Sequence, residues 1–575
     1  MRLLVEQSQR MRDEVRALDA LVVELGMLDR IQWGMTPDHD VRVHFDFTVK
    51  DKLYEAELVY PSLFPEAPAY VRPRNQDEAW SSHRYPATGT LCLEWGPDNW
   101  QSNITGADLV RSTIRLLVYE KLGTSVGVEA PSRHDLTLGQ RMRGETSRFL
   151  ATPDLRAAIA ASQRATIPLV TATTGRLSTL VTLPTKVGEE ADPPLASLPP
   201  EIGSLAMSWV RNGWVVKVDE WASLPKPCLT PAAAREFLKS KGCWPWPDDV
   251  DRVWFLLLVN AQGELRPLAF SAGDAPAAHE YVVLEGKGDQ HARQPDRHAA
   301  LAQKRVAIVG CGSLGSKLAL SLVRSGVTRF ILVDDDVLMP DNLVRHQLDW
   351  LSVGHGKAEA LKAAMLMVRP DAEIQSKTFR FAGQESASLN TVVLEQIAAC
   401  DLVIDATANP RVYSSIAAIC TRRKVACVWG EVFAGGIGAL MARSLPDHDA
   451  EPLTVRAATH HYLADKPEAP FKRAQNYEAD DDGGGEVLVA GDAEVSQLAA
   501  SMTQFVIDAL CGAPYRFPVP AYLIGFQQAW IFEAPFDTHA IACQAVAAGE
   551  QTSQDLGVDI EALKEVMSKF QTTPA

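Results

Sequence analysis

The feature that most constrains the fold is a glycine-rich turn between an apolar strand pattern and a helix pattern. Residues 305–309 are mostly apolar, residues 316–324 have helical spacing, and residues 330–333 form a second apolar run. The turn between the first two segments has the order G-x-G-x-x-G and contains Gly310, Gly312 and Gly315. A strand, a glycine turn, a helix and a second strand open a doubly wound α/β sheet. We therefore expect a Rossmann-like sheet to begin near residue 305.

The glycine turn also predicts a binding site for phosphate. Glycines let a ligand approach the backbone, and the helix that follows points its N-terminal amides at the ligand. Asp334 ends the second strand, 24 residues after Gly310. A carboxylate at this place can bind a ribose hydroxyl, so these residues alone also fit a dinucleotide such as NAD.

The residues after Asp334 favour a triphosphate over a dinucleotide. Asn342, Arg345 and Lys357 come where a phosphate chain extends beyond the ribose. With the Gly356-Lys357 pair, this pattern resembles the adenylating enzymes that activate ubiquitin and the sulfur carriers of molybdopterin and thiamine synthesis. The resemblance implies ATP as cofactor, Asp334 as ribose ligand and the three later residues as groups that neutralise charge as pyrophosphate leaves. The alternative is a solvated basic loop.

The expected magnesium ligand departs from that family. An aspartate that binds magnesium is expected after the strand pattern at 401–405, and Ala408 stands in its place. Asp405 is a substitute candidate, and Mg²⁺ is still expected because ATP turnover needs its phosphates screened. No protein metal site is predicted, because the nine cysteines include no C-x-x-C pair. Sulfur-carrier enzymes usually hold zinc with such pairs, so the ubiquitin-like branch is favoured.

The first part of the chain has the pattern of a separate α+β domain. Residues 2–28 repeat apolar side chains at helical spacing, and residues 41–49 and 54–60 alternate as half-buried strands do. Three prolines between Tyr60 and Pro68 mark the place where the chain leaves the sheet. We expect a helix followed by an antiparallel meander.

Three motifs in this region resemble ubiquitin-conjugating enzymes. They are the proline run, the sequence T-G-T-L-C-L-E around Cys92, and Trp100 eight residues after that cysteine. The resemblance implies that Cys92 accepts a thioester, and a thiol of ordinary pKa is nucleophilic enough for this without an elaborate base. The alternative is a cysteine that only packs. The family's oxyanion-stabilising asparagine is missing eight residues before Cys92, so His83 or Arg84 would supply a donor.

A second thiol is expected because activating enzymes of this branch usually carry their own cysteine beyond the nucleotide domain. Cys543, close to the C-terminal extension, is the preferred candidate, and Cys511, at a turn after a helix pattern, is the second. Cys427 lies in an apolar run and is expected in the core. Residues 467–491 are acidic and glycine-rich, so they form either a loop over the substrate's tail or a plain surface loop.

These patterns divide the 575 residues into three domains. We expect an α+β ubiquitin-conjugating-type domain at 1–160, a β-rich linker domain of unknown role at 165–295, and an α/β doubly wound adenylation domain with a C-terminal cysteine segment at 296–575. This order resembles the fusion enzyme of bacterial CBASS antiphage operons. The resemblance implies that the C-terminus of a cGAS-like nucleotidyltransferase is activated and ligated to a lysine-bearing target. It also implies a homodimer.

The formal net charge of −16 at pH 7 argues against nucleic acid and anionic membranes as partners. No apolar run is long enough to span a bilayer, and the first residues have the pattern of an amphipathic helix rather than a signal peptide. We therefore expect a cytoplasmic protein. Two alternatives stay open: a sulfur-carrier-type adenylyltransferase, and an NAD-binding Rossmann protein with an appended non-catalytic scaffold.

Overall fold

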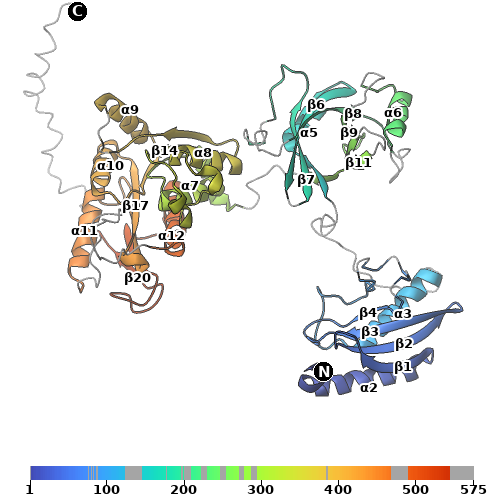
Figure 1. Ribbon diagram of the computed structural model, residues 1–575. Helices are drawn as coiled ribbons and strands as arrows, with labels where there is room; N and C mark the ends of the chain where they lie inside the picture. Colours follow the sequence, from blue (N-terminus) through green and yellow to red (C-terminus); the bar gives the residue numbers. More distant parts are fainter. Residues whose placement is uncertain are drawn as a thin grey trace, which may run out of the picture. The chain divides into compact units, whose positions relative to one another are not determined.

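The computed structural model divides the chain into two compact units, residues 1–144 and 145–575 (Figure 1). It describes residues 2–122, 146–199, 209–245, 254–270, 278–285, 294–467 and 490–543, apart from gaps at 76, 79, 82, 86–87, 177, 196–197, 220, 222–229, 382 and 384–385. Among these residues, no helix combines the length and the apolar character that a membrane crossing requires.

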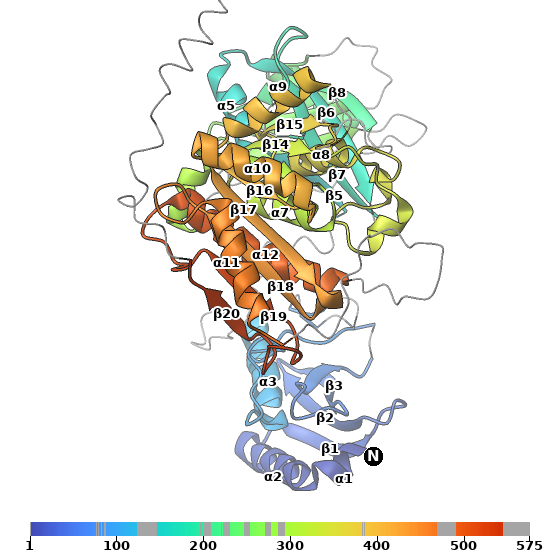
Figure 2. The ribbon, with the colours of Figure 1, turned by 90° about the vertical axis from the view of Figure 1, so that its left-hand side faces the viewer.

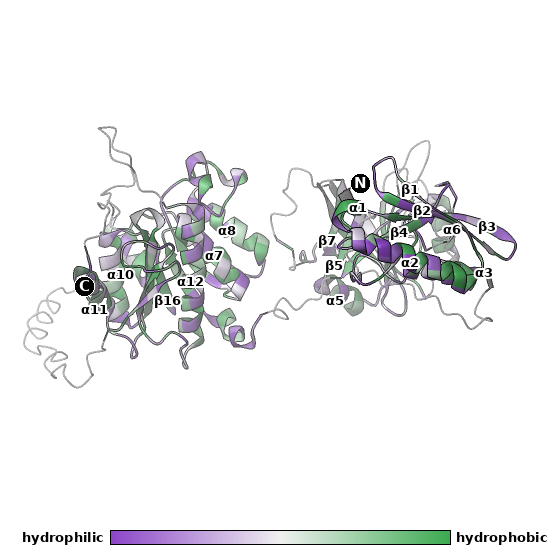
Figure 3. Ribbon diagram, turned by 90° about the horizontal axis from the view of Figure 1, so that it is seen from below, coloured by the Kyte–Doolittle hydropathy of each residue, from purple (hydrophilic) through white to green (hydrophobic). Residues whose placement is uncertain are grey.

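The first unit is an antiparallel sheet of four strands with helices packed against it. The strands follow the chain in the order β1-β2-β3-β4 and are Leu28–Met35, Val41–Val49, Lys52–Tyr60 and Tyr70–Pro73. The helices are α1 (Arg2–Glu6), α2 (Ser8–Leu25) and α3 (Gly106–Leu122). Hydrophilic and hydrophobic residues alternate along α2 (Figure 3), because one face packs in the core through Met11, Leu18 and Leu21. The predicted helix and meander are confirmed.

The second unit begins with an eight-stranded sheet whose two edge strands, β11 and β12, are adjacent in the sequence. Its order is β11-β10-β9-β8-β6-β7-β5-β12. Only Tyr281 separates β11 from β12, so the sheet curves back on itself, as the middle of Figure 1 shows. The strands β5 to β12 are Ser147–Ala151, Thr166–Arg176, Thr179–Val187, Trp209–Lys217, Trp254–Val259, Leu265–Phe270, Ala278–Glu280 and Val282–Glu285; the helices are α5 (Pro153–Ala161) and α6 (Pro231–Ser240).

The end of the first domain lies earlier than the expected residue 160. β5 pairs in parallel with β7 and β12, and Leu155 and Ile159 of α5 pack in the core of the same curved sheet. Residues 147–161 therefore belong with the middle sheet. Their partners in β12 are 134 residues away in the sequence (Arg148 to Val282), and local patterning carries no information on such pairing.

A second eight-stranded sheet follows, in the order β15-β14-β13-β16-β17-β18-β19-β20. The first five strands in that order are parallel, and β18 to β20 are antiparallel. The strands β13 to β20 are Arg305–Val309, Arg329–Val333, Glu373–Lys377, Leu402–Asp405, Ala426–Phe433, Gly438–Ser444, Ala521–Gly525 and Thr538–Ile541. The predicted strand, glycine turn, helix and strand from residue 305 are confirmed.

Helices cover both faces of this sheet, which is the doubly wound arrangement (Figure 2). One apolar core holds α7 (Ser313–Ser325), α8 (Lys357–Val368) and α12 (Asp492–Cys511). The other holds α9 (Ala387–Ala398), α10 (Pro410–Arg423) and α11 (Pro452–Ala464). Cys427 of β17 is fully buried in the second core, as its apolar run predicts.

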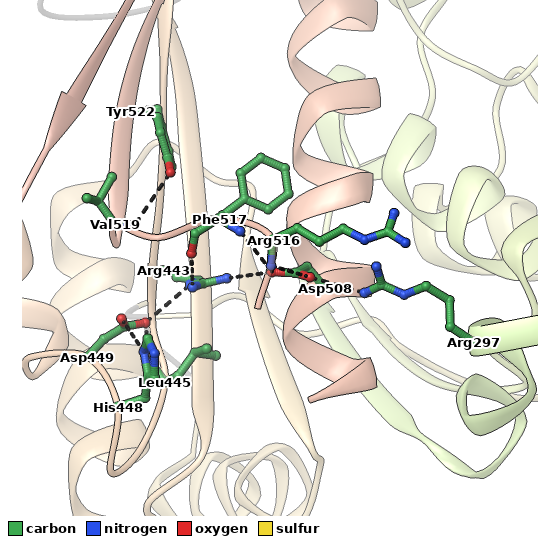
Figure 4. Close-up of polar contacts among 10 residues, drawn as sticks. All are labelled: Arg297, Arg443, Leu445, His448, Asp449, Asp508, Arg516, Phe517, Val519 and Tyr522. Carbon is green, nitrogen blue, oxygen red and sulfur yellow. Dashed lines mark hydrogen bonds and ion pairs between the residues drawn. The ribbon is translucent and has the colours of Figure 1, made fainter. Parts of the chain in front are cut away.

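A buried ion network ties α12 to the antiparallel part of this sheet (Figure 4). Arg443 of β18 is fully buried and pairs with Asp449 at 3.2 Å and with Asp508 of α12 at 3.3 Å. Asp508 also pairs with Arg297 at 3.1 Å. These carboxylates compensate the buried guanidinium charge, which would otherwise be costly.

Candidate active site

The glycine turn between β13 and α7 has a different requirement at each glycine. Gly310 has φ +88°, a backbone conformation that favours glycine. A Cβ at Gly315 would lie 1.8 Å from the carbonyl oxygen of Gly310, so α7 packs too closely there for a side chain. A Cβ at Gly312 would meet no protein atom within 4 Å. Among the residues that the structure describes, no contact requires glycine at 312, and the open space lies at the N-terminal cap of α7, where backbone amides attract anions.

Asp334, at the end of β14, reaches across to this turn. Its Oδ2 accepts a hydrogen bond from the backbone N–H of Cys311 at 2.6 Å, and its Oδ1 accepts one from the N–H of Asp336 at 2.9 Å. Burial raises the pKa of Asp334 above its ordinary value, although these two hydrogen bonds favour the charged form. The carboxylate therefore joins the strand end to the turn, and its role as a ribose ligand stays a prediction.

The residues that the sequence pattern assigns to the phosphates lie in the segment from Asp336 to Lys357. Asn342 closes a 3₁₀ turn, because its Oδ1 accepts the N–H of Met339 at 3.0 Å, and Arg345 ends that turn. Val337 bridges to Gly356, which brings the start of α8 back beside Asp336. Asn342 and Arg345 therefore lie in the turn after β14, and Lys357 is the first residue of the helix α8 that follows it.

Lys357 is buried and forms an ion pair with the exposed carboxylate of Asp336. Burial by itself raises the pKa of Asp336, but the hydrogen bonds from Lys357 and from the N–H of Val337, together with the charge of Lys357, outweigh it, and the pKa lies below the ordinary value. A phosphate would compete with Asp336 for this ammonium group. The ion-pair partner of Lys357 in this structure is therefore a solvent-exposed carboxylate that a phosphate can replace.

His346 joins the two halves of the site, and the sequence analysis did not include it. The side chain of His346 is buried, and its Nε2 lies 2.8 Å from the carbonyl oxygen of Cys311. Its Nδ1 accepts the N–H of Leu348 at 3.2 Å, so Nε2 carries the proton and donates. Burial lowers the pKa of His346, which keeps the ring neutral. The ring holds the loop after Arg345 against the glycine turn.

Asp405 ends β16 beside β13, and one of its two carboxylate oxygens already accepts hydrogen bonds from Thr407. The Oδ1 accepts from the N–H of Thr407 at 3.0 Å and from its hydroxyl at 2.6 Å. Burial raises the pKa of Asp405. Ala408 has φ +52°, and Asn409 caps α10. Among the residues that the structure describes, no group of three or more His, Cys, Asp or Glu side chains is arranged to hold a metal ion.

Cys543 follows β20, at the far edge of the sheet from the glycine turn. The ladder pairs put Asp405, Trp429, Ala442, Ala521 and Ile541 in one row. This row crosses four strand spacings, which is about 19 Å at about 4.8 Å each. The structure therefore does not place the segment before Cys543 beside the nucleotide residues.

The two candidate thiols differ in their surroundings. Cys543 packs at the margin of the second core, and burial raises the pKa of its thiol. The thiol of Cys511 lies 3.3 Å from the carbonyl oxygen of Arg297 and donates to it. The acidic loop expected at 467–491 lies almost wholly outside the described residues.

In the first unit, Cys92 lies on a short hairpin that rests on the sheet and on α3. The backbone N–H of Cys92 donates to His83 at 2.9 Å, Leu91 donates to Val71 of β4 at 2.9 Å, and Glu94 donates to the hydroxyl of Ser112 of α3 at 3.1 Å. Only 8% of Cys92 is exposed. Burial raises the pKa of its thiol, and the nearby hydroxyl of Tyr85 acts in the opposite direction. The sequence analysis did not single out Tyr85.

Three features of this structure are compatible with ATP at the predicted nucleotide residues. Gly312 leaves open space at a helix N-terminus, Asp334 stands at the strand end beside it, and Lys357 has a solvent-exposed partner that a phosphate can replace. Trp100 supports the first unit instead: its indole N–H donates to the carbonyl of Pro65 at 2.7 Å.

Comparisons with known proteins agree with this division. Residues 290–474 match the model of the ThiF family. The chain is 39% identical over 118 residues to the ATP-dependent ubiquitin transferase-like protein Cap2 of Enterobacter hormaechei subsp. hoffmannii, a match that covers 20% of this chain and 19% of that protein. It is 34% identical over 136 residues to the molybdopterin-synthase adenylyltransferase of Escherichia coli, covering 24% and 52% of the two chains.

Among solved structures, a crystal structure of E. coli MccB with ATP aligns with a TM-score of 0.32 at 16% identity, over 44% of this chain and 67% of that one. The match to the Cap2 protein spans about a fifth of that relative's length. The family model covers residues 290–474, and the first unit lies outside this range.

Proposed function

We propose that this chain uses ATP to activate the C-terminal carboxylate of a protein and passes it, through thioesters, to an amine on a target. The carboxylate attacks the α-phosphate, pyrophosphate leaves, and the product is an acyl-adenylate. Cys543 then takes the acyl group and releases AMP, and Cys92 receives it by thioester exchange. An amine, which we expect to be a lysine side chain, finally takes it as an amide.

The observation that carries the adenylation step is the open position at Gly312. A glycine with no protein neighbour at the N-terminus of α7 is explained by a ligand that comes close to the backbone there. Asp334 then supports binding at the ribose, and Lys357 can leave Asp336 to neutralise charge on the departing pyrophosphate. The ThiF-family match and the ATP-dependent name of the Cap2 relative support the same reaction.

The conjugating step rests on the first unit alone. Its order of helix, four-stranded meander, cysteine hairpin and helix is compatible with the resemblance to ubiquitin-conjugating enzymes. We extend the proposal to a cGAS-like nucleotidyltransferase as the activated protein, in bacterial antiviral defence, and to a cytoplasmic homodimer that requires Mg²⁺. These parts come from the resemblance to CBASS fusion enzymes and stay predictions.

The test is exchange of radiolabelled pyrophosphate into ATP, with a peptide that ends in the C-terminal sequence of a cGAS-like nucleotidyltransferase. We expect exchange that depends on the peptide and on Mg²⁺. Lys357→Met should slow it about 100-fold or more, because one preorganised donor to the developing charge is lost. Lys362→Met, on the same helix α8, is the matched control and should exchange as wild type does.

Absence of exchange with every such peptide, together with saturable binding of NAD, would overturn the adenylation proposal in favour of a dinucleotide-binding protein. Equal exchange by Lys357→Met and wild type would remove Lys357 from the site while leaving the reaction in place.

A second candidate function is sulfur-carrier adenylation, which the 34% identity to the E. coli molybdopterin-synthase adenylyltransferase favours. Both functions begin with an acyl-adenylate, so pyrophosphate exchange does not separate them. They differ in the product, because a sulfur carrier ends as a free thiocarboxylate and a conjugated protein ends as an amide. Mass spectrometry of the activated peptide after incubation with sulfide donors or with lysine distinguishes the two.

A further inference from the structure

The hairpin that carries Cys92 has two faces, and its register decides which side chains share the face of the thiol. Arg84 and Leu91 form an antiparallel bridge. The N–H of Tyr85 donates to the carbonyl of Thr90 at 2.8 Å, and the N–H of Cys92 donates to the carbonyl of His83 at 2.9 Å. These hydrogen bonds pair residue 85 with 90 and residue 83 with 92.

Because side chains alternate along a strand, His83, Tyr85, Thr90 and Cys92 lie on one face of the hairpin, and Arg84 and Leu91 lie on the other. Tyr85 is the diagonal neighbour of Cys92. Diagonal neighbours across an antiparallel pair lie about 7–8 Å apart at their backbones, which an aromatic side chain spans easily.

The exposure of the two side chains fits a contact in which the tyrosine covers the sulfur. Cys92 is 8% exposed, whereas Tyr85 is 55% exposed. The phenol is close enough to the sulfur to lower the pKa of the thiol, against the larger effect of burial. Burial of its ring is the main cause that raises the pKa of Tyr85, and the nearby Cys92 thiol is the second. The phenol therefore keeps its proton and can act as a donor.

We propose that the hydroxyl of Tyr85 is a catalytic hydrogen-bond donor to Cys92, taking the place of the oxyanion-stabilising asparagine that the hairpin lacks. The inference rests on the proposed thioester chemistry at Cys92. The candidates from sequence were His83, which shares the face of the thiol, and Arg84. Arg84 lies on the opposite face of the hairpin, which argues against it.

The chemical step balances without an external acid or base. The Cys92 thiolate attacks the carbonyl carbon of the incoming thioester, a new C–S bond forms, and the C–S bond to the donor cysteine breaks to release that cysteine as a thiolate. Tyr85 donates to the attacking sulfur and then to the oxyanion that forms beside it, and its proton stays on the phenol throughout.

The first experiment measures the rate at which iodoacetamide alkylates Cys92 as a function of pH, in the full chain, with the Cys92 peptide quantified by mass spectrometry. Tyr85→Phe removes only the hydroxyl from an exposed ring, so the fold is retained. Loss of a hydrogen bond to a charged group should raise the pH midpoint by about one unit and slow alkylation about tenfold at lower pH. Thr88→Val is the control, because it removes a hydroxyl that bonds to Thr90 at 3.0 Å in the same hairpin.

An unchanged pH midpoint in Tyr85→Phe would overturn the inference, as would an equal shift in Thr88→Val. This readout requires no substrate, so it is separate from the proposed function. Discharge of a thioester from Cys92 to lysine is the second measurement, and Tyr85→Phe should slow it about tenfold at saturating lysine. If wild-type Cys92 carried no thioester, the proposed function would fail while the alkylation result still decided whether Tyr85 donates to the sulfur.

Discussion

At the scale of single residues, the glycine turn separates what the fold needs from what a ligand needs. Gly312→Ala places a methyl group in open space, at φ −75°, where alanine is unstrained. We expect thermal stability equal to that of the wild type and binding of Mg·ATP at least tenfold weaker, because the methyl group keeps the phosphates away from the backbone. Calorimetric titration with Mg·ATP and thermal unfolding of the same samples measure both effects.

Gly315→Ala is the matched control for this prediction, because its Cβ would lie 1.8 Å from the carbonyl oxygen of Gly310. Overpacking of this kind costs about 1–3 kcal/mol of the free energy of unfolding. Equal loss of stability in both variants, or ATP binding by Gly312→Ala at the wild-type level, would show that the space at Gly312 does not hold phosphate.

The sequence supports some site residues and cannot show others. Gly310 and Asp334 are predictable because the turn and the strand end that position them are local. His346 lacks such a signal, since its role comes from a contact to Cys311, 35 residues earlier in the chain. Tyr85 is next to the sequence candidates His83 and Arg84, but only the pairing of residues 83–85 with residues 90–92 shows that it shares the face of Cys92.

At the scale of secondary-structure elements, Asp508 holds α12 to its surroundings. It accepts from the N–H groups of Arg516 and Phe517 and from the guanidinium groups of Arg297 and Arg443 (Figure 4). Burial by itself raises the pKa of Asp508, but these hydrogen bonds outweigh it and the pKa lies below the ordinary value. The carboxylate is therefore ionised in the folded protein at neutral pH.

Asp508→Asn should destabilise the C-terminal sheet by about 3 kcal/mol at pH 7, because a buried guanidinium loses a charged partner. A folded-state pKa below the unfolded one contributes stability above about pH 4, and this stability is lost as the pH falls through the folded-state value. The difference between variant and wild type should therefore shrink below pH 4. Calorimetric unfolding at pH 7 and pH 3.5 checks the sign.

The control for Asp508→Asn is Asp447→Asn, which breaks an exposed ion pair of 3.6 Å with Lys424. We expect no measurable change from it, because exposed pairs contribute little. A constant difference between Asp508→Asn and wild type across this pH range would mean that the lost interaction is not electrostatic.

Element types were more predictable than element partners. The helix and strand patterns at residues 2–28, 41–49 and 305–333 gave the correct element types, because periodic burial is written into the local sequence, although the first helix pattern is divided into α1 and α2 and ends at Leu25. β1 was not predicted, and β5 was assigned to the wrong domain. Both errors concern strands whose place depends on pairing rather than on their own pattern.

At the scale of the whole molecule, the proposed relay must connect residues that belong to different parts of the fold. The glycine turn and Cys92 lie in different compact units. Within the second unit, four strand spacings separate Asp405 from the row position just before Cys543. Adenylation and the two thioester steps are therefore expected to be separable by mutation, because no residue is shared between the three places.

The last prediction follows from that separation. With ATP and the activated peptide, Cys92→Ala should retain pyrophosphate exchange, accumulate a thioester on Cys543 and form no amide product. Cys543→Ala should retain exchange but lose both thioesters, because the acyl group cannot leave the adenylate for a thiol. Cys511→Ala is the control and should behave as wild type, since the Cys511 thiol already donates to the carbonyl of Arg297. Acid-quenched, non-reduced samples mapped by mass spectrometry locate each thioester, and a thioester on Cys92 in the Cys543→Ala variant would show that the acyl group reaches Cys92 by another route.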